Sequence, residues 1–231
     1  KILDVLVTDL ATAEALLARK HERGTGTVTE NSKSEMIARA RVIAQREADA
    51  VSALAAQFDG RLADVGSLLL NCRGHVLVTG AGTSRAIAQR LAHLLSCSGT
   101  PSLFISASDG LHGGSGAVTP DDVVYLISKG GHSGEINQFA EIARSRGAKL
   151  IAQTENPGSP LAQMCDAVYE VKAVGEVDPY GMVATGSSLV NGAAGDVLCV
   201  LLLEERGYTK EAFGQTHPGG SVGIKLEAEQ A

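Results

Sequence analysis

From residue 75 onward, the apolar residues of this chain gather in short β-branched runs that alternate with helical segments. The runs are "HVLVTG", "SLFIS", "DVVYLIS", "AKLIAQT" and "DAVYEV". Apolar runs of about four to six residues without strict alternation are typical of parallel strands buried on both faces, with helices as crossovers. The pattern predicts an α/β fold, a three-layer α/β/α sandwich with a parallel sheet. A long helix is expected from about Met182 to Arg206.

The first 73 residues follow a helical pattern instead. Leu3, Leu6 and Leu10 begin one apolar face, and after the polar stretch "RGTGTVTENS" a second amphipathic stretch starts at Ser34. We therefore expect a helical N-terminal extension over residues 1–73 that packs on a main domain over residues 74–231. The extension could also exchange with a neighbouring subunit.

Composition and charge narrow the function classes. The 231 residues are 44% hydrophobic with a net charge of −6, and the first 73 residues carry 10 Lys plus Arg against 10 Asp plus Glu, which disfavours a nucleic-acid partner. The longest apolar run has seven residues, whereas a bilayer span needs about 20, so no membrane association and a cytoplasmic location are expected. The four cysteines are far apart in the sequence and are expected to be reduced, structural thiols.

Three loops that follow predicted strands combine glycines with hydroxyl side chains: "TGAGTS" at 79–84, "SKGGHS" at 128–133 and "TENPGS" at 154–159. Each ends in a serine, which we expect to cap the next helix. Ligands of open parallel sheets bind beyond the carboxyl ends of the strands, where free N–H groups and helix dipoles attract phosphate. The loops predict a phosphate site, although similar turns also occur where nothing binds. The dinucleotide and P-loop fingerprints are not met.

Several longer stretches resemble a known family. In order they are "GAGTSRAIAQRLAHLLSCSGTPSLFI", "DGLHGGSGAVTPDDVVYLIS", "SGEI", "GEVDPYGM", "TGSSLVNGAAGDVL" and "THPGGSVG". Together they are similar to the sugar isomerase (SIS) fold, and more narrowly to the isomerase domain of bacterial arabinose-5-phosphate isomerases, over residues 77–226. Many of these isomerases carry tandem CBS modules after this domain, and none is expected after the last motif here.

The resemblance implies reversible interconversion of an aldose phosphate and a ketose phosphate through an enediol, without a cofactor. It also implies a homo-oligomer, with a tetramer favoured, in which sites are shared between subunits. It implies His217 and Glu176 as the acid/base pair. His132 stands where the resembled enzymes have a glutamate, and Thr83 where they have a lysine. His132 is therefore either a replacement base or a pocket-lining residue, and we expect a sugar phosphate other than arabinose 5-phosphate.

The substrate-binding candidates come from the loops and from the start of the long helix. They are Gly82, Thr83, Ser84, His112, Ser128, Gly131, Ser133, Thr185, Ser187 and Ser188. No metal site is expected, and His112 is the metal candidate to consider because some relatives use it to bind zinc or sugar. Plain loop or capping roles stay open for these residues, and a non-catalytic sugar-phosphate sensor is the alternative function.

Overall fold

The computed structural model describes residues 30–175, 177–178, 180–219, 223–224 and 228. The chain divides into two compact units, residues 1–45 and 46–231, and helix α2 (Glu30–Ser52) crosses from one to the other. The apolar face that begins at Leu3 lies outside the described residues. The boundary expected between residues 73 and 74 coincides with the start of the strand pattern and stays a prediction.

The second unit is built on a five-stranded parallel sheet with the order β2-β1-β3-β4-β5. Each of the five predicted runs contains one strand: β1 (Val76–Gly80), β2 (Ser102–Phe104), β3 (Val123–Ile127), β4 (Lys149–Thr154) and β5 (Ala167–Glu170). Every residue of β1 and β3 is buried, which confirms that the central strands are covered on both faces. In register, Val76 of β1 pairs with Ser102 on one side and Val123 on the other.

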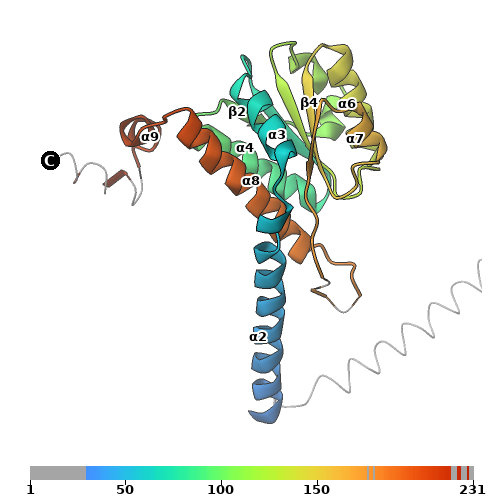
Figure 1. Ribbon diagram of the computed structural model, residues 1–231, viewed down its shortest axis with the longest axis vertical. Helices are drawn as coiled ribbons and strands as arrows, with labels where there is room; N and C mark the ends of the chain where they lie inside the picture. Colours follow the sequence, from blue (N-terminus) through green and yellow to red (C-terminus); the bar gives the residue numbers. More distant parts are fainter. Residues whose placement is uncertain (1–29, 176, 179, 220–222, 225–227, 229–231) are drawn as a thin grey trace, which may run out of the picture. The chain divides into compact units, whose positions relative to one another are not determined.

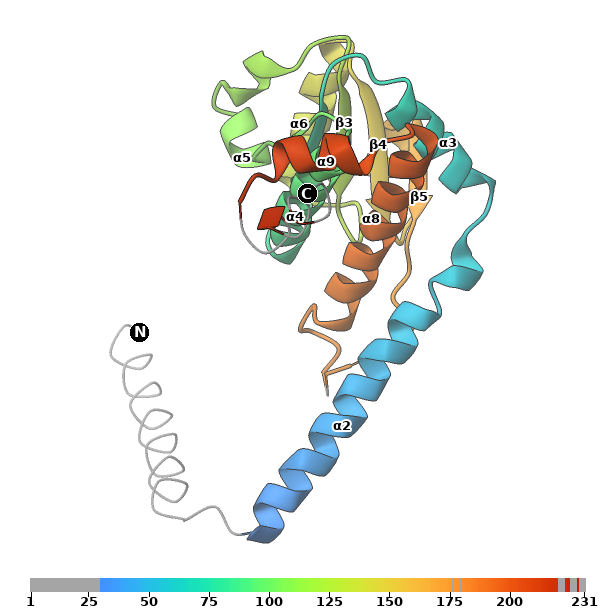
Figure 2. The ribbon, with the colours of Figure 1, turned by 90° about the vertical axis from the view of Figure 1, so that its left-hand side faces the viewer.

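Helices cover both faces of the sheet, which confirms the three-layer fold (Figures 1 and 2). One face carries α3 (Gly60–Leu70), α4 (Thr83–Cys97) and α8 (Gly186–Glu205). The other carries α5 (Ala107–Gly110), α6 (Gly134–Ser145) and α7 (Pro160–Met164). The remaining described elements are η1 (Ala55–Gln57), η2 (Gly114–Ala117) and α9 (Lys210–Thr216).

The two faces of the sheet have separate hydrophobic cores. Alternate residues of each strand point to opposite faces, so Tyr125 joins the core under α3, α4 and α8, whereas Leu126 joins the core under α5, α6 and α7. Phe139 of α6 and Leu198 of α8 are fully or almost fully buried, one in each core. The strand ends are thereby held at fixed positions, which is what a site built from their loops requires.

The predicted long helix is present, but it begins later than expected. Helix α8 starts at Gly186 rather than near Met182. The carboxylate of Asp178 accepts hydrogen bonds from the backbone N–H groups of Tyr180, Met182 and Val183, and these hold the preceding residues in a turn. By length and composition α8 could cross a bilayer, with a mean hydropathy of 1.5, but half of it is buried within the domain, as in the core helix of an α/β protein.

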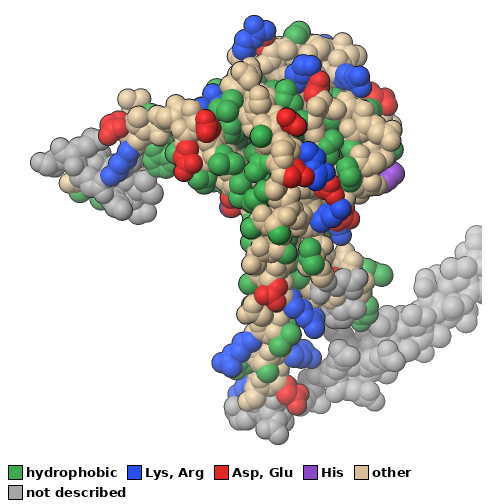
Figure 3. All heavy atoms as spheres, in the orientation of Figure 1, with side chains coloured by type: hydrophobic (Ala, Val, Ile, Leu, Met, Phe, Trp, Pro, Cys, Tyr) green, Lys and Arg blue, Asp and Glu red, His purple; other side chains and the backbone are tan. Residues whose placement is uncertain are grey.

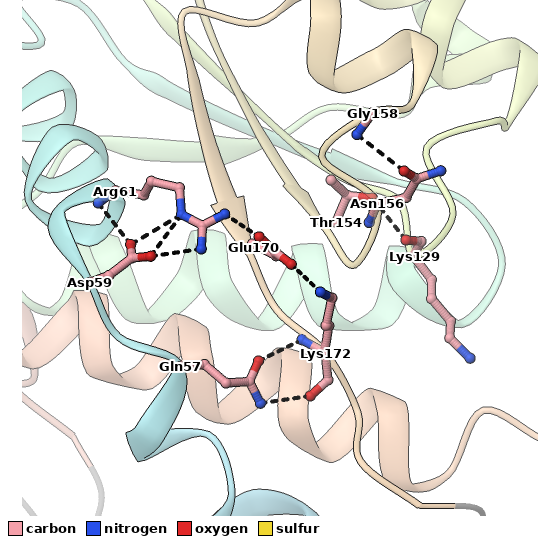
Figure 4. Close-up of polar contacts among 9 residues, drawn as sticks. All are labelled: Gln57, Asp59, Arg61, Lys129, Thr154, Asn156, Gly158, Glu170 and Lys172. Atoms are coloured by element: carbon pink, nitrogen blue, oxygen red, sulfur yellow. Dashed lines mark hydrogen bonds and ion pairs between the residues drawn. The ribbon is translucent and has the colours of Figure 1, made fainter.

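The outer edge of β5 is covered by the segment that leads into α3 (Figure 4). The amide of Gln57 donates to the carbonyl of Lys172 at 2.9 Å and accepts from its N–H at 2.8 Å, so one side chain pairs with the strand's continuation as a neighbouring strand would. Glu170 forms ion pairs with both Arg61 and Lys172, and Arg61 also binds Asp59. This segment therefore closes an edge that would otherwise be open to pairing.

Candidate functional site

The strand order reverses direction between β1 and β3, at the centre of the sheet. The connection after β1 leads toward one side of the sheet and the connection after β3 leads toward the other, so a crevice forms beyond the carboxyl ends of these two strands. The turns that follow β1 and β3 belong to the two glycine-hydroxyl stretches at residues 79–84 and 128–133. The structure thus places next to each other the two loops that the sequence singles out.

In the first loop, Gly82 rather than Ser84 is the N-cap of α4, so the predicted capping role of Ser84 is wrong. Gly82 has a φ of 55°, a left-handed conformation that glycine adopts without steric cost, and the helix begins at Thr83. A Cβ at Gly80 would lie 2.6 Å from the carbonyl oxygen of Ser84, so the first turn packs tightly against the strand end. The hydroxyl of Thr79 is buried and has no hydrogen-bond partner among the described residues.

The second loop turns sharply at Gly131. Its φ is 69°, its N–H donates to the carbonyl of Ser128 at 3.2 Å, and a Cβ there would lie 2.1 Å from Ser159 Oγ. Ser133 is the N-cap of α6, but its hydroxyl lies 3.3 Å from Ser128 Oγ instead of capping the helix. Two hydroxyls therefore meet where the first free N–H groups of α6 begin.

The third loop contains the cap that the sequence predicts correctly. Ser159 accepts a hydrogen bond from the N–H of Ala162 at 3.3 Å, and Pro160 is the first residue of α7. The loop is joined to the second loop through Lys129, whose carbonyl accepts from Thr154 Oγ1 at 2.8 Å and from the N–H of Glu155 at 3.0 Å (Figure 4). The backbone after β3 is thus fixed to the backbone after β4.

A polar cavity of about 330 Å³ opens beyond the ends of β3, β4 and β5. It is lined by Lys129, Glu155, Ala173, Gly175, Val177, Asp178, Gly181, Val183, Gly186 and Ser187. Lys129 Nζ lies 3.9 Å from a Glu155 carboxylate oxygen. The backbone N–H groups around Asp178, that of Tyr180 first, lower the pKa of its carboxyl, so Asp178 is a fixed negative charge and a poor base.

The first turn of α8 forms one wall of this cavity and is anchored to the sheet. Asn191 donates to the carbonyl of Ser187 at 2.7 Å and accepts from Gln153 of β4 at 2.6 Å. Gln153 in turn accepts from the hydroxyl of Tyr125 at 2.7 Å. The Ser188 hydroxyl donates to the carbonyl of Ala184. Among the predicted binding residues of this turn, only Ser187 lines the cavity; Thr185 Oγ1 is buried with no partner in the described part of the chain.

The three predicted histidines belong to three different segments of the fold. His217 ends α9, where its ring stacks on Phe213 with centroids 3.8 Å apart and its Nδ1 lies 3.0 Å from the carbonyl oxygen of Phe213. His132 and His112 are exposed, His132 in the second loop and His112 in the turn after α5. Glu176 lies outside the described residues, although its neighbours Gly175 and Val177 line the cavity.

Within one chain, the cavity lies at the first turn of α8, whereas His217 lies at the end of α9, which follows the last turn of α8. Helix α8 spans about 30 Å between them, with the cavity at its first turn and α9 beyond its last (Figure 1). After α8, Arg206 donates to Thr100 Oγ1 at 3.0 Å and to the carbonyl of Leu69 at 2.9 Å, on the side where β2 begins. The structure therefore does not bring His217 to the loops of its own chain.

A second cavity, of about 530 Å³, lies between α3 and α8 and is apolar. Leu62, Leu70, Leu198, Leu201 and Leu202 are among its lining residues. Hydrophobic side chains gather over this part of the surface in Figure 3. In the described part of the chain, no three His, Cys, Asp or Glu side chains cluster as metal ligands would.

The family model of the SIS domain matches residues 69–201, more than half of the chain. The chain belongs to the SIS family. The five-stranded parallel sheet, the two loops at its switch point and α8 all lie within or beside the matched range, so the site described above is a site of an SIS domain.

Two curated relatives are arabinose 5-phosphate isomerases named KdsD. The protein from Pseudomonas aeruginosa is 37% identical over 180 residues, 78% of this chain and 55% of that protein. The protein from Escherichia coli K12 is 39% identical over 155 residues, 67% of this chain and 47% of that protein. The chain spans about half the length of these curated relatives, and the likeness covers the SIS region.

Two solved structures have the same fold. A structure of an Escherichia coli CFT073 protein in complex with arabinose 5-phosphate superposes with a TM-score of 0.77 at 32% identity, covering 82% of this chain and all of that one. A candidate sugar-phosphate isomerase from Listeria monocytogenes gives 0.78 at 33% identity and covers 84% of this chain and all of that one. This chain is therefore a homologue of bacterial arabinose-5-phosphate isomerases and shares their SIS fold.

Sequence reasoning missed several residues of the cavity and of the hydrogen-bonded network behind it. Lys129 and Glu155 are each among the first residues after a strand, and that position could have identified them. Gln153 is the polar residue in an otherwise apolar strand stretch, "LIAQ", which is a signal of a buried hydrogen-bond partner. Asp178 precedes a Pro-Tyr-Gly turn, but nothing in the sequence says which N–H groups it binds.

Proposed function

We propose that this chain is an isomerase that interconverts an aldose phosphate and a ketose phosphate through an enediol, using general acid and base side chains and no cofactor. The observation that carries the proposal is the pairing of SIS membership with two hydroxyl-rich loops at the switch point of the sheet. Phosphosugar isomerases belong to this family, and the crevice has the backbone geometry that phosphate binding needs.

The phosphate is bound by the starts of α4 and α6. Gly82, Thr83 and Ser84 offer N–H groups and hydroxyls at the start of α4, and Ser128, Gly131 and Ser133 do so before α6. The Ser128 and Ser133 hydroxyls, 3.3 Å apart, can both donate to one phosphate. Thr185, Ser187 and Ser188 contact the sugar from the first turn of α8, and His112 lines the sugar pocket without a metal.

The acid and base groups are His217 and Glu176, with His132 assisting. A base removes the proton from the carbon next to the carbonyl, and the electron pair moves to the carbonyl oxygen. A proton passes from the neighbouring hydroxyl to that oxygen, and the first proton returns to the former carbonyl carbon, so the carbonyl moves to the next carbon. An imidazole is suited to this near neutral pH, both for ring opening and for carrying protons. His132 occupies the second loop, where the resembled isomerases have a glutamate.

The active form is a cytoplasmic homo-oligomer, a tetramer, in which His217 of one chain serves the site of another. Support comes from the distance of about 30 Å that α8 puts between His217 and the cavity of the same chain. The apolar cavity between α3 and α8, and the exposed Val200 and Leu201, offer a surface for such assembly.

The substrate is a sugar phosphate other than arabinose 5-phosphate. Thr83 and His132 stand where the resembled arabinose-phosphate isomerases have a lysine and a glutamate, so two charged groups of that site are changed. The relative solved in complex with arabinose 5-phosphate makes that compound the reference for comparison.

An interconversion assay tests this proposal. The protein is incubated with arabinose 5-phosphate, ribulose 5-phosphate, ribose 5-phosphate and fructose 6-phosphate, and aldose and ketose products are separated and quantified. We expect the protein to convert at least one of them, with arabinose 5-phosphate slower than the best. Conversion of none of them would contradict the proposal.

A non-catalytic sugar-phosphate sensor is the second candidate, because Thr83 and His132 replace charged residues while the hydroxyl loops remain. The same panel decides between them. A sensor would gain thermal stability with one of the sugar phosphates but convert none.

A further inference from the structure

The described residues that line the cavity beside α8 include one cationic side chain. Among the described residues that line it, Lys129 is the cation, whereas Glu155 and Asp178 are carboxylates. Lys172 and Arg61, two other cations near the ends of β4 and β5, both form ion pairs with Glu170. Any negative charge that develops in this cavity would therefore meet Lys129 first.

The base of the Lys129 side chain is held in place. The backbone carbonyl of Lys129 accepts two hydrogen bonds, one from Thr154 Oγ1 and one from the N–H of Glu155. The backbone N–H of Ser128, the residue before it, donates to the carbonyl of Gln153 at 3.1 Å. In Figure 4 the side chain of Lys129 extends away from these contacts. The backbone is thus rigid while the ammonium group remains outside this hydrogen-bonded cluster.

The ammonium group of Lys129 has N–H donors available for a ligand. Lys129 Nζ lies 3.9 Å from Glu155, beyond the usual length of a charge-assisted hydrogen bond, and the Lys129 side chain is 52% exposed. An ammonium has three N–H donors, so one directed toward Glu155 leaves two for a ligand. Glu155 is close enough to attract the ammonium group but too far away to occupy its hydrogen-bond donors.

We propose that Lys129 is the catalytic cation of this site, donating a hydrogen bond to the substrate oxygen that becomes negatively charged in the enediolate. The proposal rests on the isomerase function proposed above. When the base removes the C2 proton of the aldose, the electron pair moves to the carbonyl oxygen on C1 and the ammonium stabilises the charge there. The hydroxyl proton on the C2 oxygen then passes to the C1 oxygen and the carbon-bound proton returns to C1, which leaves the carbonyl at C2 and removes the charge. No bond to Lys129 forms or breaks.

This assignment gives a reason for the change at Thr83. The resembled isomerases have a lysine in the first loop, and this chain has a cation in the second loop instead. The loop that carries Lys129 follows β3 and the loop that carries Thr83 follows β1, and these two strands are neighbours in the sheet. A preorganised donor acts on the transition state more than on the bound substrate, and its loss lowers kcat rather than raising KM.

The test compares Lys129→Met with Lys149→Met in the full chain. Lys149 is the first residue of β4, at the end of that strand opposite the cavity. Its side chain is 59% exposed and pairs with Asp166 at 2.8 Å, so it is a matched control outside the site. Rates are measured with the four sugar phosphates named above. We expect Lys129→Met to lower kcat by about 10²- to 10³-fold with KM changed less than about threefold, and Lys149→Met to match the wild type.

Several outcomes would overturn the assignment. If the wild type is active but Lys129→Met keeps its kcat, or only its KM rises, Lys129 does not stabilise the enediolate and the isomerase proposal stands without it. An equal loss in Lys149→Met would mean a nonspecific effect and would also overturn it. A wild type inactive on all four compounds would remove both proposals. Should Lys129→Met not fold, Lys129→Gln carries the same comparison.

Discussion

The side-chain amides of Gln153 and Asn191 are joined by a hydrogen bond of 2.6 Å, which connects β4 directly to α8. Gln153 is fully buried, and its two ends bind the Tyr125 hydroxyl and Asn191. The side-chain amide of Asn191 donates a hydrogen bond to the carbonyl of Ser187, a residue that lines the polar cavity. The first turn of α8 is thus positioned by polar contacts through the core rather than by apolar packing alone.

Replacing Gln153 with Met should be costly, because it leaves the buried Tyr125 hydroxyl and the side-chain oxygen of Asn191 without the partner that each now has. We expect a loss of about 1–3 kcal/mol in the free energy of unfolding, measured by urea denaturation. The control is Gln163→Met: Gln163 is an exposed glutamine whose amide donates to the carbonyl of Gly158 at 3.1 Å, and a change within about 0.5 kcal/mol is expected. Equal effects of both substitutions would contradict the role of the network.

The turn at Gly131 should not tolerate a side chain. Gly131→Ala would force a φ of 69° on alanine and press its Cβ to within 2.1 Å of Ser159 Oγ, so we expect a loss of at least about 1 kcal/mol and weaker sugar-phosphate binding. Gly130→Ala is the matched control, because the nearest atom to its added Cβ is 3.9 Å away. Thermal unfolding of both variants measures the difference, and a Gly131→Ala protein as stable as Gly130→Ala would refute this description of the loop.

The ion pairs of Glu170 predict a pH dependence of stability. The hydrogen bond from Lys172, and then that from Arg61, lower the pKa of the Glu170 carboxyl below its value of 4.5 in the unfolded chain. A lowered pKa stabilises the fold above pH 4.5, and this stabilisation is lost as the pH falls through the folded-state pKa. Glu170→Gln should therefore be less stable than the wild type at pH 7, with the gap narrowing toward pH 3 in urea titrations. A gap that widens in acid would be inconsistent with this sign.

His132 offers a gain-of-function test. If it acts at the position where the resembled enzymes use a glutamate, His132→Glu should raise the turnover of arabinose 5-phosphate by about tenfold or more, because a carboxylate base would be restored. His93→Glu, an exposed exchange on α4, is the control and should change nothing. No gain with His132→Glu would indicate that His132 only lines the pocket.

Much of the fold follows from the sequence pattern. The five apolar runs each contain a strand, and the continuous burial of β1 and β3 explains why their apolar residues do not alternate with polar ones. Ser159 followed by Pro160 marks the start of α7 correctly. The glycine-hydroxyl stretches at residues 79–84 and 128–133 were expected at the carboxyl ends of strands, and the strand order makes those strands, β1 and β3, neighbours.

The rest depends on contacts between residues far apart in the sequence. Ser84 looks like a cap, but Gly82 can take a left-handed φ and starts the helix earlier. Met182 looks helical, yet Asp178 binds the N–H groups that a helix would use. The Lys129 and Glu155 pair, the Gln153 network and the distance between His217 and the cavity arise from the packing of β3, β4 and α8, which local sequence patterns do not specify.

The central claim is that this chain moves a proton between neighbouring carbons of a sugar phosphate. The most direct measurement is the entry of solvent deuterium at C1 or C2 of each phosphate in the panel, followed by NMR in deuterated water. We predict exchange with at least one compound by the wild type, and a loss of about 10²-fold or more in His217→Ala combined with Glu176→Gln. Thermal stabilisation by a sugar phosphate without deuterium entry into any compound would contradict the claim and favour a sensor.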